Sequence, residues 1–141
     1  IDQAGLLRVE NIGFAMGLTS LRGAFRQTTT SLEYITPNIP ETVTSFEELF
    51  RESLCAADLR DMDTRNITTI RRIFYRSDGT GPNCANWDVG RVEDVFQAFA
   101  DSQMNSPFSL GNWESLTSME EMFVQTIGDY YGARDGRVRF N

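Results

Sequence analysis

A phenylalanine recurs along most of the chain at a nearly constant interval of about 24 residues, and this regularity constrains the fold more than any other feature. The five positions are Phe25, Phe50, Phe74, Phe99 and Phe123. Further apolar residues stand seven, four and one residues before each phenylalanine, in the units LTSLRGAF, VTSFEELF, ITTIRRIF, VEDVFQAF and LTSMEEMF. Units of this length bury their apolar side against neighbouring units. We therefore predict one domain over residues 1–141, with repeats that end near residues 25, 50, 74, 99 and 123.

The spacing of apolar residues inside each unit indicates a short helix, because these positions share one face of an α-helix. Serine or threonine with glutamate three residues later is typical of a capping box at a helix start. Such pairs are Thr44 with Glu47, Ser45 with Glu48 and Thr117 with Glu120. The segments that connect the units are rich in Pro, Gly, Asn, Asp and Ser, and they have room for turns and one short strand. The sequence thus predicts an α/β solenoid of five repeats with short helices, short parallel strands and an internal column of phenylalanines.

The two ends of the chain do not resemble the polar capping repeats that usually close a repeat array. The first unit begins near residue 18, and residues 128–141 read as a glycine-marked tail or hairpin. The chain also begins at Ile1 rather than at a methionine, which indicates a removed leader or a piece of a longer polypeptide. We expect at least one end of the array to be covered by more chain or by another subunit.

Charge and residue types weigh against several function classes. The 20 acidic residues outnumber 13 basic ones, all of them arginine, and a net charge of -7 disfavours nucleic-acid binding. Arg71, Arg72 and Arg76 form the closest basic group. The chain has no histidine, the commonest general base and a common zinc ligand. The acidic run around Asp61 fails the calcium-loop pattern. We expect no catalysis, no metal and no cofactor.

The two cysteines, Cys55 and Cys84, lie more than a whole unit apart in the sequence, which is not metal-ligand spacing. Small buried thiols are one interpretation. A disulfide between neighbouring coils is the other, if the protein is secreted.

The units resemble a known family of repeats. NWDVGRVEDVFQAF (86–99) and GNWESLTSMEEMF (111–123) are similar to the repeat of the BspA-like leucine-rich-repeat proteins. SLEYITPNIPETVTSFEELF (31–50) resembles the sister form of that repeat. The resemblance spans roughly residues 6 to 127 and implies a right-handed leucine-rich-repeat coil. Trp113 stands ten residues before its phenylalanine whereas Trp87 stands twelve before its own, so we expect irregular coils.

The resemblance implies protein–protein contact at a surface. We expect a non-catalytic interaction or adhesion module that is extracellular or displayed on a cell surface and whose partners are other proteins, such as host surface proteins. The alternative is a structural component of a virion, such as a phage capsid decoration or a tail or attachment protein, with particle subunits as partners. No apolar run is long enough for a membrane span. The candidate contact residues are Trp87, Trp113, Tyr130 and Tyr131, each of which could instead pack within its own coil.

Overall fold

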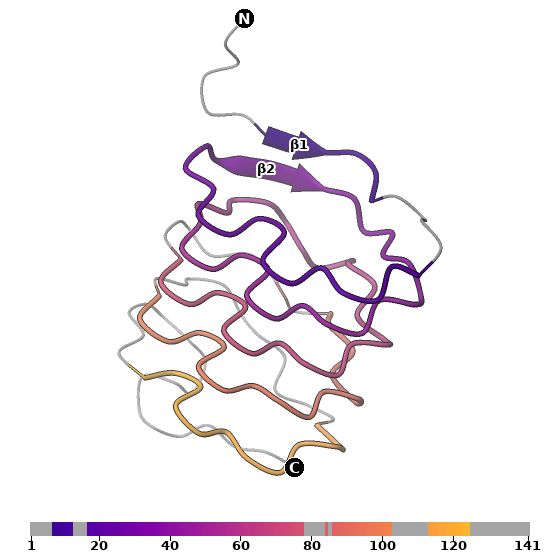
Figure 1. The fold of residues 1–141 in the computed structure, drawn as a ribbon, viewed down its shortest axis with the longest axis vertical. Coiled ribbons are helices and arrows are strands. Elements are labelled where there is room, and N and C mark those ends of the chain that lie inside the picture. Colours follow the sequence, from indigo (N-terminus) through magenta and orange to yellow (C-terminus); the bar gives the residue numbers. More distant parts are fainter. Residues whose placement is uncertain (1–6, 13–16, 78–83, 85, 103–112, 125–141) are drawn as a thin grey trace, which may run out of the picture.

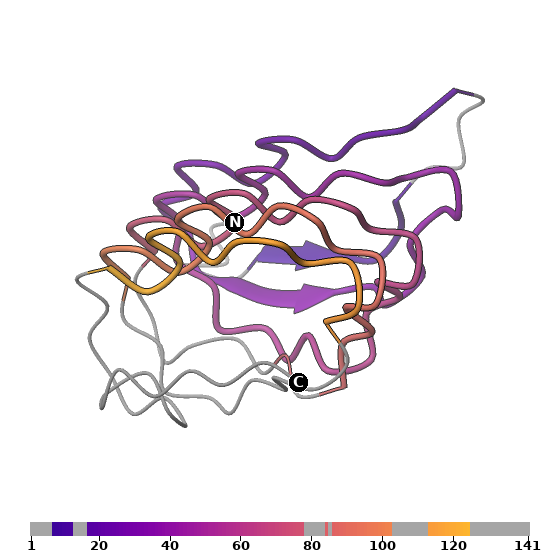
Figure 2. The same ribbon diagram turned by 90° about the horizontal axis from the view of Figure 1, so that it is seen from below.

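A computed structural model describes residues 7–12, 17–77, 84, 86–102 and 113–124 of the chain. Two short strands, β1 (Leu7–Val9) and β2 (Leu32–Ile35), form a parallel pair in which Leu7 lies opposite Leu32 (Figure 1). Below them, successive segments of the chain lie side by side in sequence order, and Figure 2 shows these segments one behind another. In the described ranges no helix is long and apolar enough to cross a membrane.

Five segments, here called turn segments, repeat the same backbone path. They are residues 20–27, 45–52, 69–76, 94–101 and 118–124. Single parallel bridges join the first residues of neighbouring segments, namely Ser20 with Ser45, Ser45 with Thr69, and Thr69 with Asp94. Between the first two segments, alternate N–H groups donate to alternate carbonyls at 2.8–3.0 Å. The donors are Leu21, Gly23, Phe25 and Gln27, and the acceptors are Ser45, Glu47, Leu49 and Arg51. Each segment therefore needs its neighbour to satisfy half of its backbone donors.

The predicted α/β solenoid with short helices is wrong, because the described residues contain two short strands and no helix. In a helix every N–H bonds to a carbonyl four residues earlier in the same segment. Here alternate N–H groups donate to carbonyls of the next segment. The N–H groups between them close tight turns, as in the hydrogen bonds from Ala24 to the Leu21 carbonyl and from Leu49 to the Phe46 carbonyl. A tight turn closed between residues three positions apart also places side chains three or four positions apart on the same side of the segment. The apolar spacing therefore fits both structures.

Each turn segment contains a residue with left-handed backbone two positions before its phenylalanine. The φ angles are 63° at Gly23, 55° at Glu48, 51° at Arg72, 51° at Gln97 and 54° at Glu121. A positive φ at the third residue of a turn is characteristic of type II turns and favours glycine. Only the first segment has glycine there, so the other four carry side chains in a conformation that costs about 1–2 kcal/mol.

This backbone predicts how Gln97 tolerates substitution. Gln97→Val should lower the free energy of unfolding by more than about 1 kcal/mol, because a β-branched residue is strongly disfavoured at positive φ. Gln97→Gly, the matched control, should be neutral or stabilising. Urea denaturation followed by circular dichroism measures both. Equal stability of the two variants would contradict this account of the turn.

The five phenylalanines form a stacked column inside the molecule. Ring centroids of successive members lie 5.8, 5.2, 5.6 and 5.4 Å apart, with interplanar angles of 19° or less. The three inner rings are fully buried, whereas the two end rings, Phe25 and Phe123, are partly buried. Aliphatic residues of the same segments surround the column, and together they make one continuous core.

Hydroxyl side chains form a second column, three residues after each of the first four phenylalanines. Its members are Thr28, Ser53, Ser77 and Ser102. Each donates at 2.6 Å to the carbonyl of a column phenylalanine: Thr28 to Phe25, Ser53 and Ser77 to Phe50, and Ser102 to Phe99. The serines are buried, so these bonds satisfy carbonyls that water does not reach.

The predicted capping boxes are also corrected by the structure. Ser45 Oγ accepts a hydrogen bond from the Glu47 N–H, two residues on, at 3.2 Å, as in a serine/threonine turn. The equivalent residues of the other segments accept in the same way, namely Ser20, Thr69, Asp94 and Ser118. These side chains start a turn rather than a helix. The predicted tail or hairpin at 128–141 lies outside the described residues.

Candidate functional site

The solvent side of the turn segments carries a regular array of charged, polar and aromatic side chains, which we call the turn face. It consists of Arg22, Arg26, Gln27, Glu47, Arg51, Glu52, Arg71, Arg72, Tyr75, Arg76, Phe96, Gln97, Asp101, Glu120 and Glu121. In the three inner segments these residues stand on either side of a buried stretch that includes the column phenylalanine. The same periodicity that builds the core therefore spaces the exposed side chains at fixed intervals.

Many side chains of the turn face are tied to the equivalent position of the next segment. Arg22 pairs with Glu47 at 3.1 Å, and Gln27 donates to Glu52 at 2.9 Å. Further along, Arg72 donates to Gln97 at 2.7 Å, and Arg76 pairs with Asp101 at 3.1 Å. Exposed pairs of this kind contribute at most about 1 kcal/mol each. Their main consequence is that they hold long side chains in place.

Two aromatic rings lie among the arginines in the middle of the turn face. The guanidinium carbons of Arg51, Arg72 and Arg76 lie 5.1, 5.8 and 5.2 Å from the centroid of the Tyr75 ring. Those of Arg71 and Arg72 lie 4.4 and 5.3 Å from the Phe96 ring. These are cation–π distances. The basic group Arg71, Arg72 and Arg76 is thus packed on aromatic rings, and Arg71 and Arg76 also pair with Asp94 and Asp101.

At the base of the turn face, Glu48 is only 5% exposed. Arg51 donates a hydrogen bond to it, and Arg22 and Arg26 approach its carboxylate at 3.7 and 3.8 Å. Burial alone would raise the pKa of Glu48. The hydrogen bond from Arg51 and the charges of the three arginines outweigh burial, so the pKa of Glu48 is lowered.

This cluster predicts a loss of stability in acid. Because the pKa of Glu48 is lower in the folded chain than its ordinary value of 4.5, its contribution is complete above that value and disappears as the pH falls through the folded pKa. Denaturant titrations at neutral pH and at about pH 3 should show a smaller acid-induced loss for Glu48→Gln than for the wild type. Equal losses in both proteins would contradict the role of this carboxylate.

The described surface includes one hollow beside the turn face and another beside β2. The larger, about 410 Å³, adjoins the turn face at Phe96 and is lined by Arg71, Glu93, Asp94, Val95, Phe96, Ser118 and Glu120. The smaller, about 250 Å³, lies beside β2 and is lined by Glu33, Tyr34, Ile35, Pro37, Asp58, Leu59, Asp61 and Met62. Among the residues that the structure describes, no group of three or more Asp, Glu, Cys or His could hold a metal ion.

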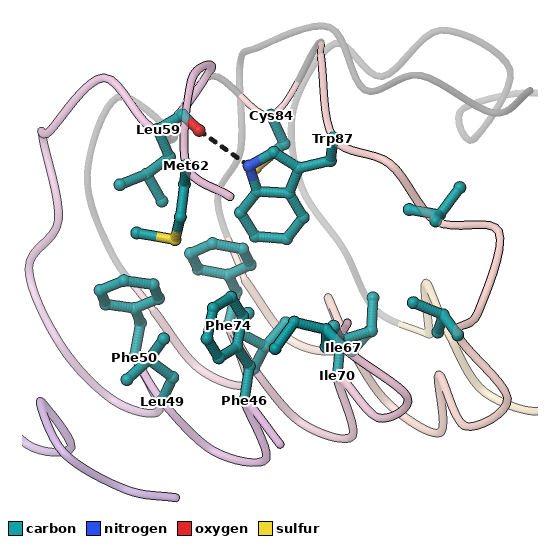
Figure 3. Packing of buried hydrophobic residues seen from close by; sticks show 14 of the residues in the cluster. Phe46, Leu49, Phe50, Leu59, Met62, Ile67, Ile70, Phe74, Cys84 and Trp87 are labelled. Atoms are coloured by element: carbon teal, nitrogen blue, oxygen red, sulfur yellow. Dashed lines mark hydrogen bonds between the residues drawn. The ribbon is translucent and has the colours of Figure 1, made fainter. Parts of the chain in front are cut away.

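The structure places both candidate contact tryptophans in the core. Trp87 is 4% exposed, and its Nε1 donates to the Leu59 carbonyl at 2.8 Å (Figure 3). Its ring contacts Phe46 and Phe74 at centroid distances of 6.4 and 6.3 Å. Trp113 is 3% exposed. Neither side chain is presented to a partner in this structure, because each fills space between chain segments.

The other two candidates, Tyr130 and Tyr131, lie outside the described residues. The reasoning from sequence missed Phe96 as a surface residue. The signal was its place three residues before Phe99, where the other four units all carry a charged residue.

Cys55 and Cys84 are both buried thiols in the structure. Burial raises the pKa of the Cys55 thiol to about 12 and raises the pKa of Cys84 well above its ordinary value. Because the thiolate is the reactive form, both groups should be inert in the folded chain. We expect iodoacetamide to label neither cysteine at neutral pH until denaturant is added, as measured by mass spectrometry. Rapid labelling of the native chain would contradict this placement.

Stacked turn segments that expose an ordered charged and aromatic face define a repeat-containing protein. The profile of a family described as "Mycoplasma protein of unknown function, DUF285" matches residues 19–128, a range that includes the five phenylalanines. The chain belongs to this family. Neither the comparison with curated proteins nor that with solved structures gave a match.

Proposed function

We propose that the chain is a non-catalytic protein–protein interaction module, displayed on a cell or particle surface and used in adhesion. The observation that carries this proposal is the turn face, on which Tyr75 and Phe96 lie among arginines held by neighbouring segments. Tyrosine and arginine are among the residues that most often dominate binding energy at protein interfaces. Side chains that are already ordered lose little entropy on binding. The resemblance of the units to BspA-like surface repeats supports the same role.

The described surface suits a broad contact better than an enclosed substrate. The hollows beside Phe96 and beside β2 combine charged and apolar side chains and lie between repeating segments. The turn face extends over all five turn segments, and a partner could therefore contact several equivalent positions at once.

A binding assay with a matched pair of variants tests this proposal. Beads coated with the full chain are incubated with cultured epithelial cells and, separately, with cells of the source organism, and bound beads are counted. The double variant Arg71→Glu, Tyr75→Ala removes the centre of the turn face. Arg60→Glu is the control, because Arg60 is exposed but pairs with Asp58 away from that face. We expect the double variant to bind about tenfold less and the control to bind like the wild type.

Two results would overturn the proposal. One is binding by the wild type that is no greater than binding by uncoated beads on both kinds of cell. The other is equal binding by the wild type and the double variant, which would place the contact elsewhere. Circular dichroism spectra of all three proteins show whether a loss of binding reflects unfolding.

A further inference from the structure

The charges of the turn face are unevenly distributed along the array. Its basic residues all belong to the first three turn segments, which carry six arginines and three glutamates. The last two turn segments, residues 94–101 and 118–124, carry four carboxylates and no basic residue. The chain as a whole has a net charge of -7. The first three segments therefore form a basic surface on an acidic molecule, and this surface attracts acidic groups.

Arg72, in the third turn segment, is held in place by three neighbours. Its Nε donates to Gln97 Oε1 in the next segment at 2.7 Å. Its guanidinium carbon lies 5.8 Å from the centroid of the Tyr75 ring and 5.3 Å from that of the Phe96 ring. Because a guanidinium is planar and its Nε is already bonded, these contacts fix the direction of its two terminal nitrogens. The side chain is only half-buried, so solvent reaches it.

Arg72 differs from the arginines around it because it has no counter-charge nearby. Each of the others pairs with a carboxylate, namely Arg51 with Glu48, Arg71 with Asp94 and Arg76 with Asp101. Among the described residues, which include both flanking segments in full, Arg72 forms no ion pair and its only hydrogen-bond acceptor is Gln97. Its terminal nitrogens are therefore available to an outside acceptor. They form the planar fork that binds a carboxylate through two parallel hydrogen bonds.

We propose that the turn face binds an acidic segment of a partner protein, and that the terminal nitrogens of Arg72 bind an aspartate or glutamate carboxylate of that segment. Arg51 and Arg76 approach the same Tyr75 ring, at 5.1 and 5.2 Å from its centroid, and add positive charge beside this contact. The Tyr75 and Phe96 rings offer apolar surface to the rest of the segment. This inference rests on the proposed function, because it specifies the chemistry of the partner for the same face.

The surroundings of Arg72 favour a short acidic stretch over a long polyanion such as heparin or a nucleic acid. The hollow beside the Phe96 ring is lined in part by the carboxylates of Glu93, Asp94 and Glu120. A continuous row of sulfates or phosphates that reached Arg72 would also meet these carboxylates, and contacts between like charges are unfavourable. A protein segment can instead place one or two carboxylates at Arg72 and neutral or basic residues elsewhere.

Nuclear magnetic resonance of the arginine side chains tests this inference. The isotope-labelled full chain has 13 arginines, and the Nε–H signal of each reports on its own guanidinium. The probe is a synthetic peptide of glycine and serine with two adjacent glutamates, and the control peptide carries glutamines in their place. At low ionic strength we expect the glutamate peptide to shift the Arg72 signal in a saturable way. The glutamine peptide should not shift it.

Matched variants identify the fork of Arg72 as the binding group. Arg72→Gln should bind the glutamate peptide about tenfold more weakly than the wild type. Arg72→Lys keeps the positive charge but loses the paired donors, so it should show a similar loss. Arg91→Gln is the control and should bind like the wild type. Arg91 also donates to a side-chain amide oxygen, that of Asn66 at 3.0 Å, but it lies outside the turn face.

Binding by the variants is followed through the backbone amide signals of residues 69–76, and the same spectra show whether each variant is folded. Three outcomes would overturn the inference. The first is a glutamate peptide that shifts no arginine signal of the wild type. The second is wild-type affinity in Arg72→Lys, which would indicate undirected charge attraction. The third is a heparin fragment or a short oligothymidylate that binds at Arg72 more tightly than the peptide.

The peptide titration and the bead assay fail separately. If the peptide does not bind but the beads adhere through the turn face, the acidic partner is rejected and the adhesion proposal stands. If the peptide binds at Arg72 but the beads do not adhere to either kind of cell, the acidic site stands and adhesion is rejected.

Discussion

Phe74→Ala should lower the free energy of unfolding by about 3–5 kcal/mol, which is a large part of the stability of an ordinary domain. The Phe74 ring is 0% exposed and lies between the rings of Phe50 and Phe99, at centroid distances of 5.2 and 5.6 Å. Trp87 covers it from a third side at 6.3 Å. Removing the ring leaves a cavity surrounded by segments of chain, none of which can close it without breaking its own hydrogen bonds. Guanidinium denaturation followed by tryptophan fluorescence measures the loss.

Phe25→Ala is the matched control for this variant. The Phe25 ring is partly exposed and stacks on one column partner, Phe50, at 5.8 Å. We expect this substitution to lower the free energy of unfolding about half as much as Phe74→Ala does. Folding buries less apolar surface at Phe25, and solvent can fill the space that the missing ring leaves. Equal costs at the two positions would contradict a continuous internal column with exposed ends.

Trp87→Ala should destabilise the chain to a similar degree, by about 3–5 kcal/mol. The indole ring fills the space between the turn segments and the residues around Leu59, and it contacts both Phe46 and Phe74. A residue that serves only to contact a partner would cost far less on truncation, because its loss would leave no internal cavity. The same denaturation experiment therefore distinguishes a core role from a surface role.

Trp87→Phe separates the hydrogen bond of Trp87 from its packing. The Leu59 carbonyl accepts from Trp87 Nε1 at 2.8 Å and also from the Met62 N–H at 3.1 Å. Because the carbonyl keeps its second donor, we expect the loss of the indole bond to cost only about 1 kcal/mol. A result as large as that of Trp87→Ala would show that the hydrogen bond, and not the ring, stabilises this region.

The periodicity of the sequence goes far toward describing the interior. The recurrence of phenylalanine gives the number and spacing of the segments, and in the structure the five rings stack. The periodicity does not predict the local backbone conformation. Both a helix and a series of tight turns place residues three or four apart on one side, so the apolar pattern cannot separate them. Of the left-handed residues that distinguish the turns, only Gly23 gives a visible signal. The others carry side chains, namely Gln27, Glu48, Glu52, Arg72, Arg76, Gln97, Asp101 and Glu121.

The candidate site was predictable only in part. Trp87 and Trp113 are predicted contact residues because they are large and aromatic, but size alone does not show whether a ring lies inside or outside the molecule. The position of the residue within the repeating unit shows whether its ring lies inside or outside. Phe96 stands at a place that faces outward in each segment, whereas Trp87 precedes the turn segment and reaches over the column. The hydroxyl column was also visible as a serine or threonine three residues after each phenylalanine, and it becomes meaningful once the buried carbonyls are known.

The crossing hydrogen bonds have a consequence for how such a chain can change in length. Every inner turn segment presents acceptors to the segment before it and donors to the segment after it, so a whole unit can be inserted or deleted while both junctions re-form. Loss of a single residue inside a turn segment is different, because the residues after it would no longer match the positions of the neighbouring segments to which they bond. The interval between successive phenylalanines is not quite constant, yet the turn segments that hold the first four phenylalanines keep the same length. Small changes in length are therefore accommodated in the connecting segments, and an array of this kind can vary in size by whole units without a new fold.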